Sequence, residues 1–336
     1  MSTLKRTVRI VKGFGVNAKR ISHIQKEVYR VVLRDGKSYC LKRMPMSAQN
    51  LQWVDHALQS VRRNGYRRIA WRNARTKEGR RISVRSGSAS YVLVPWISGR
   101  WPNVHSRREM FACGAAIAKF HNAGGAFRRP RSGAINMLGR WSAMFRGRYA
   151  TVARLVRRAS RSGSSRPTDK FLTKHGKEIL SYASKASSLL RQHRYRNLCR
   201  AGSRTVVLCH GDGGPSNFIK NAKGLHLIDF ETLRIDLRAY DLYRLIYNSC
   251  HTHRWKFSIA RDILDGYQSV TKLERADFAM LRALLRFPRT VFLSLLHNAK
   301  GSSRTQAATV REMTRALRAE RGMEAFCRKL DRYARK

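Results

Sequence analysis

One stretch of 26 residues, VVLCHGDGGPSNFIKNAKGLHLIDFE at positions 206–231, constrains the fold more than any other. An apolar run typical of a strand stops at His-Gly-Asp, and a Gly-Gly-Pro sequence then requires a tight loop. A second apolar run at residues 225–231 follows a turn and carries another aspartate. The pattern predicts two short strands that present Asp212, Asn217 and Asp229 at one edge.

These three side chains suit phosphoryl transfer, which needs positioning and charge more than covalent chemistry. One carboxylate orients an acceptor hydroxyl and takes its proton, while a second carboxylate and an amide hold Mg²⁺ on the phosphates. The spacing of Asp212 and Asn217, followed by Asp229 and a phenylalanine, matches that of a protein kinase catalytic loop. The alternative is a strand–turn–strand in which these residues only cap turns, but the combined pattern favours the chemical role.

A kinase-type site also requires nucleotide-binding residues upstream. The run SYCLKRM at residues 38–44 follows an Asp-Gly turn, which predicts a hairpin whose second strand carries Lys42 to the α- and β-phosphates. The segment PWISG at residues 95–99 is a candidate hinge. There the carbonyl of Pro95 can accept from the adenine amine, and the N–H of Ile97 can donate to the ring. A strand lysine that only faces solvent is the alternative for Lys42.

The remaining pattern predicts an α+β fold with two lobes. Residues 1–94 form a small N-terminal antiparallel β-sheet lobe with one helix, residues 95–99 the hinge, and residues 100–336 a larger, mostly helical C-terminal lobe. That lobe contains the catalytic loop at 208–231 and ends in a basic tail. Strands are predicted at 19–24, 28–33, 38–44, 67–71, 80–84 and 90–94, and helices at 50–63, 106–122, 240–249, 259–268, 275–285, 291–298 and 307–335.

The charge of the chain is unusual. It has 70 Lys and Arg residues against 20 Asp and Glu, a formal net charge of +50. Residues 123–204 are especially basic, with acids only at Asp169 and Glu178. Such a stretch is usually a solvated face or a loop, with a loop expected at 160–167, and less often a binding surface. Because this field attracts anions and repels cations, we expect an anionic rather than a cationic acceptor.

The cysteines and the apolar runs indicate the compartment. None of the six cysteines has CxxC or zinc-finger spacing, which favours buried thiols in a reducing compartment over a zinc or redox site. No run of about 18 apolar residues is present, so we expect no transmembrane segment. The N-terminus lacks the apolar core of a secretion signal. The sequence therefore predicts a cytoplasmic protein.

A family resemblance rests on HGDGGPSN and LIDFE. These motifs are similar to the aminoglycoside phosphotransferase and choline kinase branch of the protein kinase-like superfamily, in which His-x-Asp replaces His-Arg-Asp. Within that branch the chain most resembles the CotS family of bacterial spore-coat proteins. The matching segments are VYRVVLRDGKSYCLKRM, YVLVPWISGR, AIAKFHNA, CHGDGGPSNF, LIDFETLRIDLRAYDLYRLI and LLRFPRTVF.

The resemblance implies ATP and Mg²⁺ as cofactors, with Asp212 as catalytic base and His210 bracing the loop. It also implies that Asn217 and Asp229 hold Mg²⁺ and that Lys42 binds the phosphates. Asp236 and Asp241 would have structural roles. By the same resemblance the protein acts in the mother cell and is assembled onto the spore coat during sporulation. Its acceptor would be a hydroxyl of an acidic or phosphorylated coat protein or of an anionic polymer.

Two departures from the family pattern keep other functions open. The segment at residues 25–27, where a phosphate-covering loop is expected, has no glycine, and the helix at 50–63 has no Glu to pair with Lys42, only the shorter Asp55. A catalytically inactive structural component of the coat with the same fold is therefore the alternative. A third possibility is a charge-driven polyanion binder, although the sequence contains no specific nucleic-acid motif.

Overall fold

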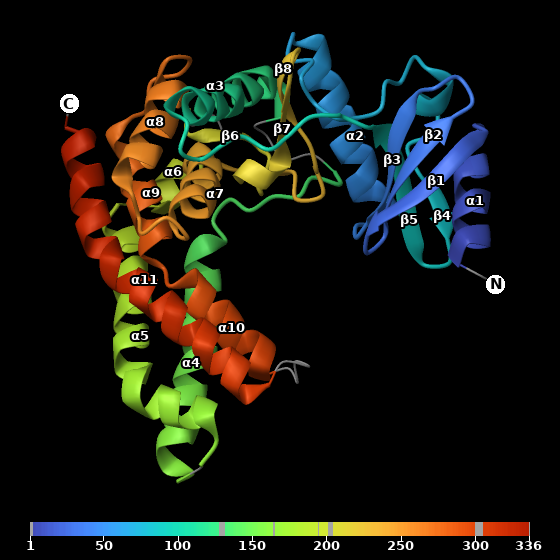
Figure 1. Cartoon of the computed structure of the whole chain (residues 1–336). Helices are drawn as coiled ribbons and strands as arrows, with labels where there is room; N and C mark the ends of the chain where they lie inside the picture. The colour runs from blue at the N-terminus through green and yellow to red at the C-terminus, as the bar shows by residue number, and fades with distance from the viewer. Residues whose placement is uncertain are drawn as a thin grey trace.

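The computed structural model describes residues 3–127, 132–163, 165–193, 195–200, 204–299 and 305–335. It contains an antiparallel five-stranded sheet near the N-terminus followed by a mostly helical part, as predicted (Figure 1). The strand order is β1-β2-β3-β5-β4. The strands are β1 (Ala18–Gln25), β2 (Val28–Leu33), β3 (Ser38–Met44), β4 (Val84–Ser86) and β5 (Ala89–Pro95).

The predicted hairpin places Lys42 within this sheet. Gly36 adopts a positive φ of 81°, which glycine tolerates at a tight turn, and the Asp35 carboxylate accepts from the Lys37 N–H at 3.0 Å. The register then pairs Val28 with Lys42 on β3. Because β3 lies between β2 and β5, the lysine is on a central strand.

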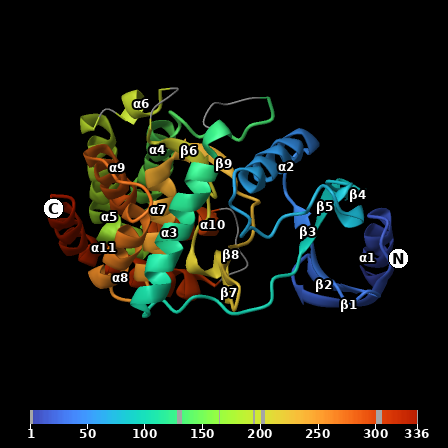
Figure 2. The ribbon, with the colours of Figure 1, turned by 90° about the horizontal axis from the view of Figure 1, so that it is seen from above.

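Two helices accompany the sheet, and they pack into different cores. Helix α1 (Thr3–Gly13), which the sequence analysis did not predict, buries Ile10 and Val11 against the sheet in a small core of its own, together with Phe14 just after the helix. Helix α2 (Ala48–Arg63) instead buries its apolar face in the larger core shared with the helical part. Figure 2 shows α2 between the sheet and those helices.

Two predicted strands differ in the structure. Residues 67–71 form only an isolated bridge, from Ile69 to Leu227, and the strand expected at 80–84 begins at Val84. The first difference has a clear cause, because the carbonyls of Ile69 and Trp71 accept hydrogen bonds from the Arg62 side chain instead of from a strand. The turn expected at 76–79 is present as a short 3₁₀ helix, Lys77–Gly79.

The helical part contains the predicted helices together with others in the basic region. Its long helices are α3 (Arg107–Ala123), α4 (Trp141–Arg161), α5 (Pro167–Gln192), α7 (Arg238–Cys250), α8 (Phe257–Gln268), α9 (Arg275–Arg286), α10 (Arg289–Ala299) and α11 (Gln306–Tyr333). Short helical turns lie at Gly125–Phe127, Tyr195–Leu198 and Pro215–Asn217.

The basic stretch at 123–204 is largely the helix pair α4 and α5, which contact each other along their length. Phe145, Val152, Phe171 and Ile179 are buried within this pair. The loop expected at 160–167 connects the two helices; Ser164 within it lies outside the described residues. Packing of one apolar face on each helix therefore leaves the Arg and Lys side chains on the outer faces.

Four short strands hold the catalytic segment, where the sequence predicted two. Strand β6 (Val206–Cys209) pairs with β9 (Arg234–Leu237), and β7 (Phe218–Asn221) pairs with β8 (Gly224–Leu227). The two predicted strands, β6 and β8, therefore pair with different partners and not with each other. The second ends at Leu227 and not at residue 231, because Asp229 has a φ of 67° that no strand accommodates.

The described helices include none that is long and apolar enough to cross a membrane. The six cysteines are free thiols, and Cys113, Cys209, Cys250 and Cys327 are buried, as the sequence predicted for most of them.

The buried Glu320 of α11 gives a test of the packing in the helical part. Its side chain is 3% exposed, and burial raises its pKa to about 8 against the opposing charge of Arg286. The folded protein therefore keeps a proton there that the unfolded chain loses near pH 4.3, so stability falls as the pH rises from 5 to 8. In Glu320→Gln, which stays neutral, we expect this loss to be smaller by roughly 1–3 kcal/mol. Urea unfolding at pH 5 and pH 8 measures it, and equal pH dependence in both proteins would contradict the assignment.

Candidate active site

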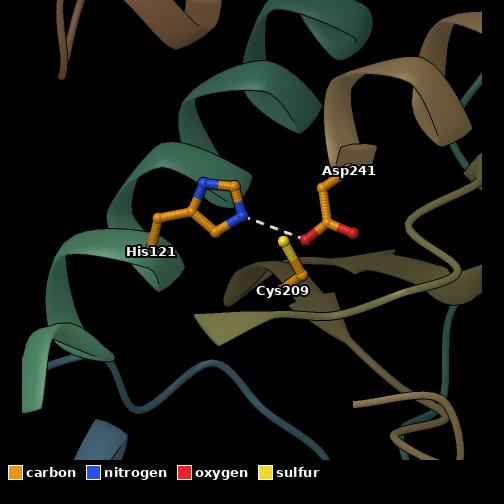
Figure 3. Close-up of side chains that lie close together, drawn as sticks. All are labelled: His121, Cys209 and Asp241. Carbon is orange, nitrogen blue, oxygen red and sulfur yellow. Dashed lines mark hydrogen bonds and ion pairs between the residues drawn. The ribbon is translucent and has the colours of Figure 1, made fainter. Parts of the chain in front are cut away.

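One buried carboxylate fixes the backbone of the catalytic loop. Asp241 on α7 accepts from the backbone N–H groups of His210 at 2.7 Å and Gly211 at 2.8 Å. His121 on α3 donates from Nε2 to the same carboxylate at 3.0 Å (Figure 3). Burial alone would raise the pKa of Asp241, but the hydrogen bond and charge of His121 hold it below its usual value. The loop is therefore attached to two helices at the point where β6 ends.

The buried side chains of His121, Cys209 and Asp241 lie close together (Figure 3), with their ligand atoms within 4.8 Å of one another. His121 Nδ1 is 2.9 Å from the hydroxyl of Tyr267, and the Cys209 thiol donates to the Leu237 carbonyl at 3.5 Å. Burial raises the pKa of the Cys209 thiol. Because these groups already have protein partners, the cluster serves as a brace and not as a metal centre.

His210 links the two halves of the catalytic segment. Its Nε2 donates to the Ile228 carbonyl at 2.8 Å, so Nδ1 is free to accept from the Asp212 N–H at 3.3 Å. The ring also packs on Phe230, with centroids 4.9 Å apart. The side chain therefore lies where a bracing residue is needed, next to both Asp212 and Asp229.

Lys42 pairs with the carboxylates that follow β8. Its Nζ lies 2.5 Å from Asp229 Oδ1 and 2.9 Å from Glu231 Oε2. Burial alone would lower the pKa of Lys42, but these two carboxylates outweigh burial and raise it. Glu231 was not predicted as its partner. Glu231 stands two residues after Asp229 in the sequence, and this closeness to a predicted site carboxylate is the signal that could have identified it.

Asp55 does not serve as the helix-borne partner of Lys42. It is buried against Trp71, whose Nε1 donates at 2.8 Å, and against Arg72, whose Nε donates at 2.5 Å. The acid on α2 therefore fixes the segment after the helix, and the positive charge of Lys42 is balanced from the other side of the cavity.

A cavity of about 810 Å³ unites the predicted nucleotide and metal residues. Lys42, Pro95, Ile97, Asn217 and Asp229 all line it. Its walls also include the apolar side chains of Val28, Val92, Val94, Trp96 and Phe230. The volume and the apolar walls fit a nucleotide-sized ligand. His210 and Asp212 are not among the lining residues.

The loop between β1 and β2 covers this cavity without glycine. Ile24 and Gln25 line the cavity, and Lys26 adopts a φ of 42°. Glu27 accepts from Arg43 at 2.8 Å and from the Tyr91 hydroxyl at 2.8 Å. Burial alone would raise the pKa of Glu27, but these partners hold it below the usual value. Hydrogen bonds of the Glu27 side chain therefore fix this turn, in place of the glycines expected in a loop that covers phosphates.

The side chains of Asn217 and Asp229 fit a magnesium ion. Asn217 Nδ2 donates to the Asp212 carbonyl at 2.6 Å, which orients the amide so that its oxygen is the atom left for a ligand. The backbone carbonyl of Asn217 accepts from the Ile228 N–H at 3.0 Å. This bond holds Asn217 next to the residue that precedes Asp229. Mg²⁺ prefers hard oxygen donors of this kind.

Asp212 has a partner that the sequence analysis missed. Arg244 on α7 donates from Nε to Asp212 Oδ1 at 3.1 Å and also bonds it through Nη2. The Arg244 side chain is buried, whereas that of Asp212 is 40% exposed. Arg244 lies three residues after Asp241, hence on the same helix face, and this spacing is the signal that could have identified it. The arginine holds the aspartate in one orientation while leaving it open to solvent.

Comparison with known proteins agrees with this geometry. The sequence model of the Phosphotransferase enzyme family, abbreviated APH, matches residues 17–284, most of the chain. The chain belongs to this family. The matched region begins one residue before β1 and ends in α9, so it includes the sheet, the cavity and the catalytic loop. The narrower resemblance to the CotS family stays a prediction.

A relative and two solved structures illustrate the likeness. The homoserine kinase of Beijerinckia indica subsp. indica is 26% identical over 222 residues, 63% of this chain and 60% of that enzyme, so the chain matches less than two thirds of it. An aminoglycoside phosphotransferase from Alicyclobacillus acidocaldarius has a TM-score of 0.80 at 18% identity, covering 97% of this chain and 96% of that one. An amicoumacin kinase in complex with AMP-PNP, Ca²⁺ and the compound abbreviated Ami has a TM-score of 0.63 at 15% identity, covering 96% of this chain and 92% of that one. These structures confirm the kinase-like fold predicted from the sequence.

The brace under the catalytic loop gives a direct test. In Asp241→Asn, the amide NH₂ must face a donor, either a backbone N–H or the His121 ring. We expect the free energy of unfolding to fall by about 3 kcal/mol, because a buried hydrogen-bonded charge is lost. Urea unfolding measures the change. The control Asp331→Asn, which breaks a half-exposed ion pair with Arg282, should cost under about 1 kcal/mol. Equal losses in the two variants would contradict the bracing role.

Proposed function

We propose that this protein is an ATP- and Mg²⁺-dependent phosphotransferase that transfers the γ-phosphate to a hydroxyl of an anionic acceptor. The observation that carries the proposal is the meeting of Lys42, Asn217 and Asp229 in one nucleotide-sized cavity. Residues far apart in the sequence, on β3 and on both sides of β7 and β8, converge there. A purely structural fold would not need a lysine and a set of oxygen donors at this place.

The chain's own residues divide the work as follows. Pro95 and Ile97 supply the backbone groups for adenine, next to Trp96, whose N–H is bonded to the Ser38 carbonyl at 3.0 Å. Lys42 leaves the carboxylates and pairs with the α- and β-phosphates. Asn217 and Asp229 would hold Mg²⁺, which would supply positive charge to neutralise the phosphates.

The transfer step requires a base and an oriented hydroxyl. Asp212 accepts the proton of the acceptor hydroxyl as its oxygen bonds to the γ-phosphorus. The bond from that phosphorus to the β,γ-bridging oxygen breaks, and ADP leaves. Arg244 holds Asp212 in one orientation, and its buried position excludes water from one side of the carboxylate.

The acceptor class follows from charge. With a net charge of +50 the protein repels cations such as aminoglycosides and attracts anions. The resemblance to the CotS family supports a place in the spore coat, with an acidic or phosphorylated coat protein or an anionic polymer as partner. Cytoplasmic synthesis in the mother cell is part of the same proposal.

A second candidate is an inactive coat component with the same fold. The observation that favours it is the double pairing of Lys42 with Asp229 and Glu231, which nucleotide must displace. The glycine-free loop over the cavity favours it as well. Charge-driven binding of polyanions is the third, and high salt separates it from binding at a built site.

Calorimetry of Mg·ATP binding at about 0.2 M salt separates these candidates, because this salt suppresses non-specific attraction of ATP. We expect the wild type to bind with Mg²⁺ dependence and Asp229→Ala to lose at least about 10-fold in affinity, since about 1.4 kcal/mol is tenfold. Asp331→Ala, which removes the same charge on α11, should bind as the wild type does. Equal binding by all three proteins would refute the phosphotransferase proposal and leave the structural role.

A further inference from the structure

A second cavity lies beside the catalytic loop. It has a volume of about 220 Å³ and is lined by three arginines, Arg148 of α4, Arg234 of β9 and Arg289 of α10. Helices α4 and α10 contact each other there, below α7 in the view of Figure 1. Aromatic rings form much of the wall. We call this cavity the arginine pocket.

The arginine pocket shares a wall with the catalytic base. Arg234 Nη2 donates to the carbonyl of Gly211 at 2.9 Å, and Gly211 immediately precedes Asp212. Tyr240 and Tyr243 of α7 also line the pocket. Arg244, the residue after Tyr243, donates a hydrogen bond to Asp212. A molecule in the pocket would therefore lie against the residues that fix Asp212.

The arginines are held in place by aromatic rings. The guanidinium of Arg234 lies 4.4 Å from the ring centroid of Tyr240, and that of Arg148 lies 5.8 Å from the centroid of Phe287. Tyr240 stacks in turn on Trp141, with centroids 4.8 Å apart. Such stacking orients the planar donor groups before any ligand binds.

The positive charge in the pocket is only partly balanced: the buried Asp236 attracts Arg234 without forming a direct ion pair with it. Within the described parts of the chain, no carboxylate forms an ion pair with Arg148, Arg234 or Arg289. The nearby Asp236 is buried behind the pocket and accepts from the indole N–H of Trp141 at 3.0 Å. Burial, together with the nearby charge of Arg289, lowers the pKa of Arg148. Like charges held together in this way are relieved by an anion.

Two buried donor atoms in this region have no hydrogen-bond partner. They are Arg234 Nε in the pocket wall and Nη1 of Arg244, whose residue is 8% exposed. Buried donors without partners are rare in folded proteins, and each costs free energy unless a ligand or water satisfies it. Together with the arginines that lack an ion pair, these donors indicate a site for a ligand that carries hydrogen-bond acceptors.

We propose that the arginine pocket binds an oxyanion, a carboxylate or a phosphate, on the same small molecule whose hydroxyl Asp212 orients. The planar forks of Arg148, Arg234 and Arg289 suit two-oxygen recognition of such groups. A volume of about 220 Å³ admits a small anionic compound and excludes a folded chain. This narrows the anionic acceptor of the proposed function to a small hydroxy acid or phosphate ester, in place of a coat protein or a polymer. Its role as acceptor rests on the proposed function, whereas oxyanion binding itself does not.

Titration calorimetry with inorganic phosphate and, in parallel, with acetate tests the pocket directly. The protein is first saturated with Mg·ADP so that phosphate cannot report on the nucleotide cavity, and the salt is about 0.2 M NaCl to suppress non-specific binding. We expect saturable binding by the wild type and a loss of at least about 10-fold in Arg148→Gln/Arg289→Gln, because the double variant removes two charged donors from the pocket. The tighter of the two probes identifies the anionic group.

The matched control is Arg154→Gln/Arg157→Gln, which removes the same charge from exposed positions of α4. It should bind phosphate within about twofold of the wild type, because screened surface charges contribute little. A second variant, Arg148→Lys, keeps the charge but loses the planar fork, and it should show an intermediate loss even if the double variant is poorly folded.

Absence of saturable binding in the wild type, or equal losses in the pocket and control variants, would overturn the proposal. Failure of the phosphotransferase function is a separate result, seen as absence of Mg·ADP binding in the first step. In that case the phosphate titration is repeated on the free protein.

Discussion

The catalytic half of the molecule depends on the buried carboxylate of Asp241. It accepts two consecutive backbone N–H groups at the end of β6 and a ring N–H of His121, so α3, α7 and the catalytic loop meet at one charge. His210, fixed in this way, reaches across to the Ile228 carbonyl and sets the turn that brings Asp229 to Lys42. Without that charge the donors of the loop would be buried unpaired, and nothing would hold the two halves of the segment in register.

The scarcity of acids explains the distribution of function in this chain. With 20 Asp and Glu against 70 Lys and Arg, the carboxylates that shape the site have basic partners, as the buried Asp55 has in Arg72 and the partly exposed Asp212 has in Arg244. Metal binding requires oxygen donors, so carboxylates gather at the catalytic segment despite the basic surface. Near the same segment, Arg148, Arg234 and Arg289 form no ion pair with a carboxylate of the described residues. They line the arginine pocket, in which an anion can bind.

The sequence predicted what local pattern determines and missed what distant partners determine. The hairpin bearing Lys42 and the loop from His210 to Asn217 follow from turn residues and spacing, and the structure places them as expected. The pairing of β6 with β9 was missed because two neighbouring apolar runs look alike whether or not they pair with each other. Helix α1 and the partners Glu231 and Arg244 were missed for a similar reason, since their importance comes from contacts across the fold.

The most direct test of the central claim is a crystal structure with Mg²⁺ and a non-hydrolysable ATP analogue. The account predicts adenine against the segment from Pro95 to Ile97, Lys42 moved from Asp229 to the α- and β-phosphates, and a metal held by Asn217 and Asp229. The contrary result would be an intact pair between Lys42 and Asp229 with the analogue absent from the cavity or bound elsewhere on the basic surface. That outcome would indicate that the protein keeps the phosphotransferase fold without the activity.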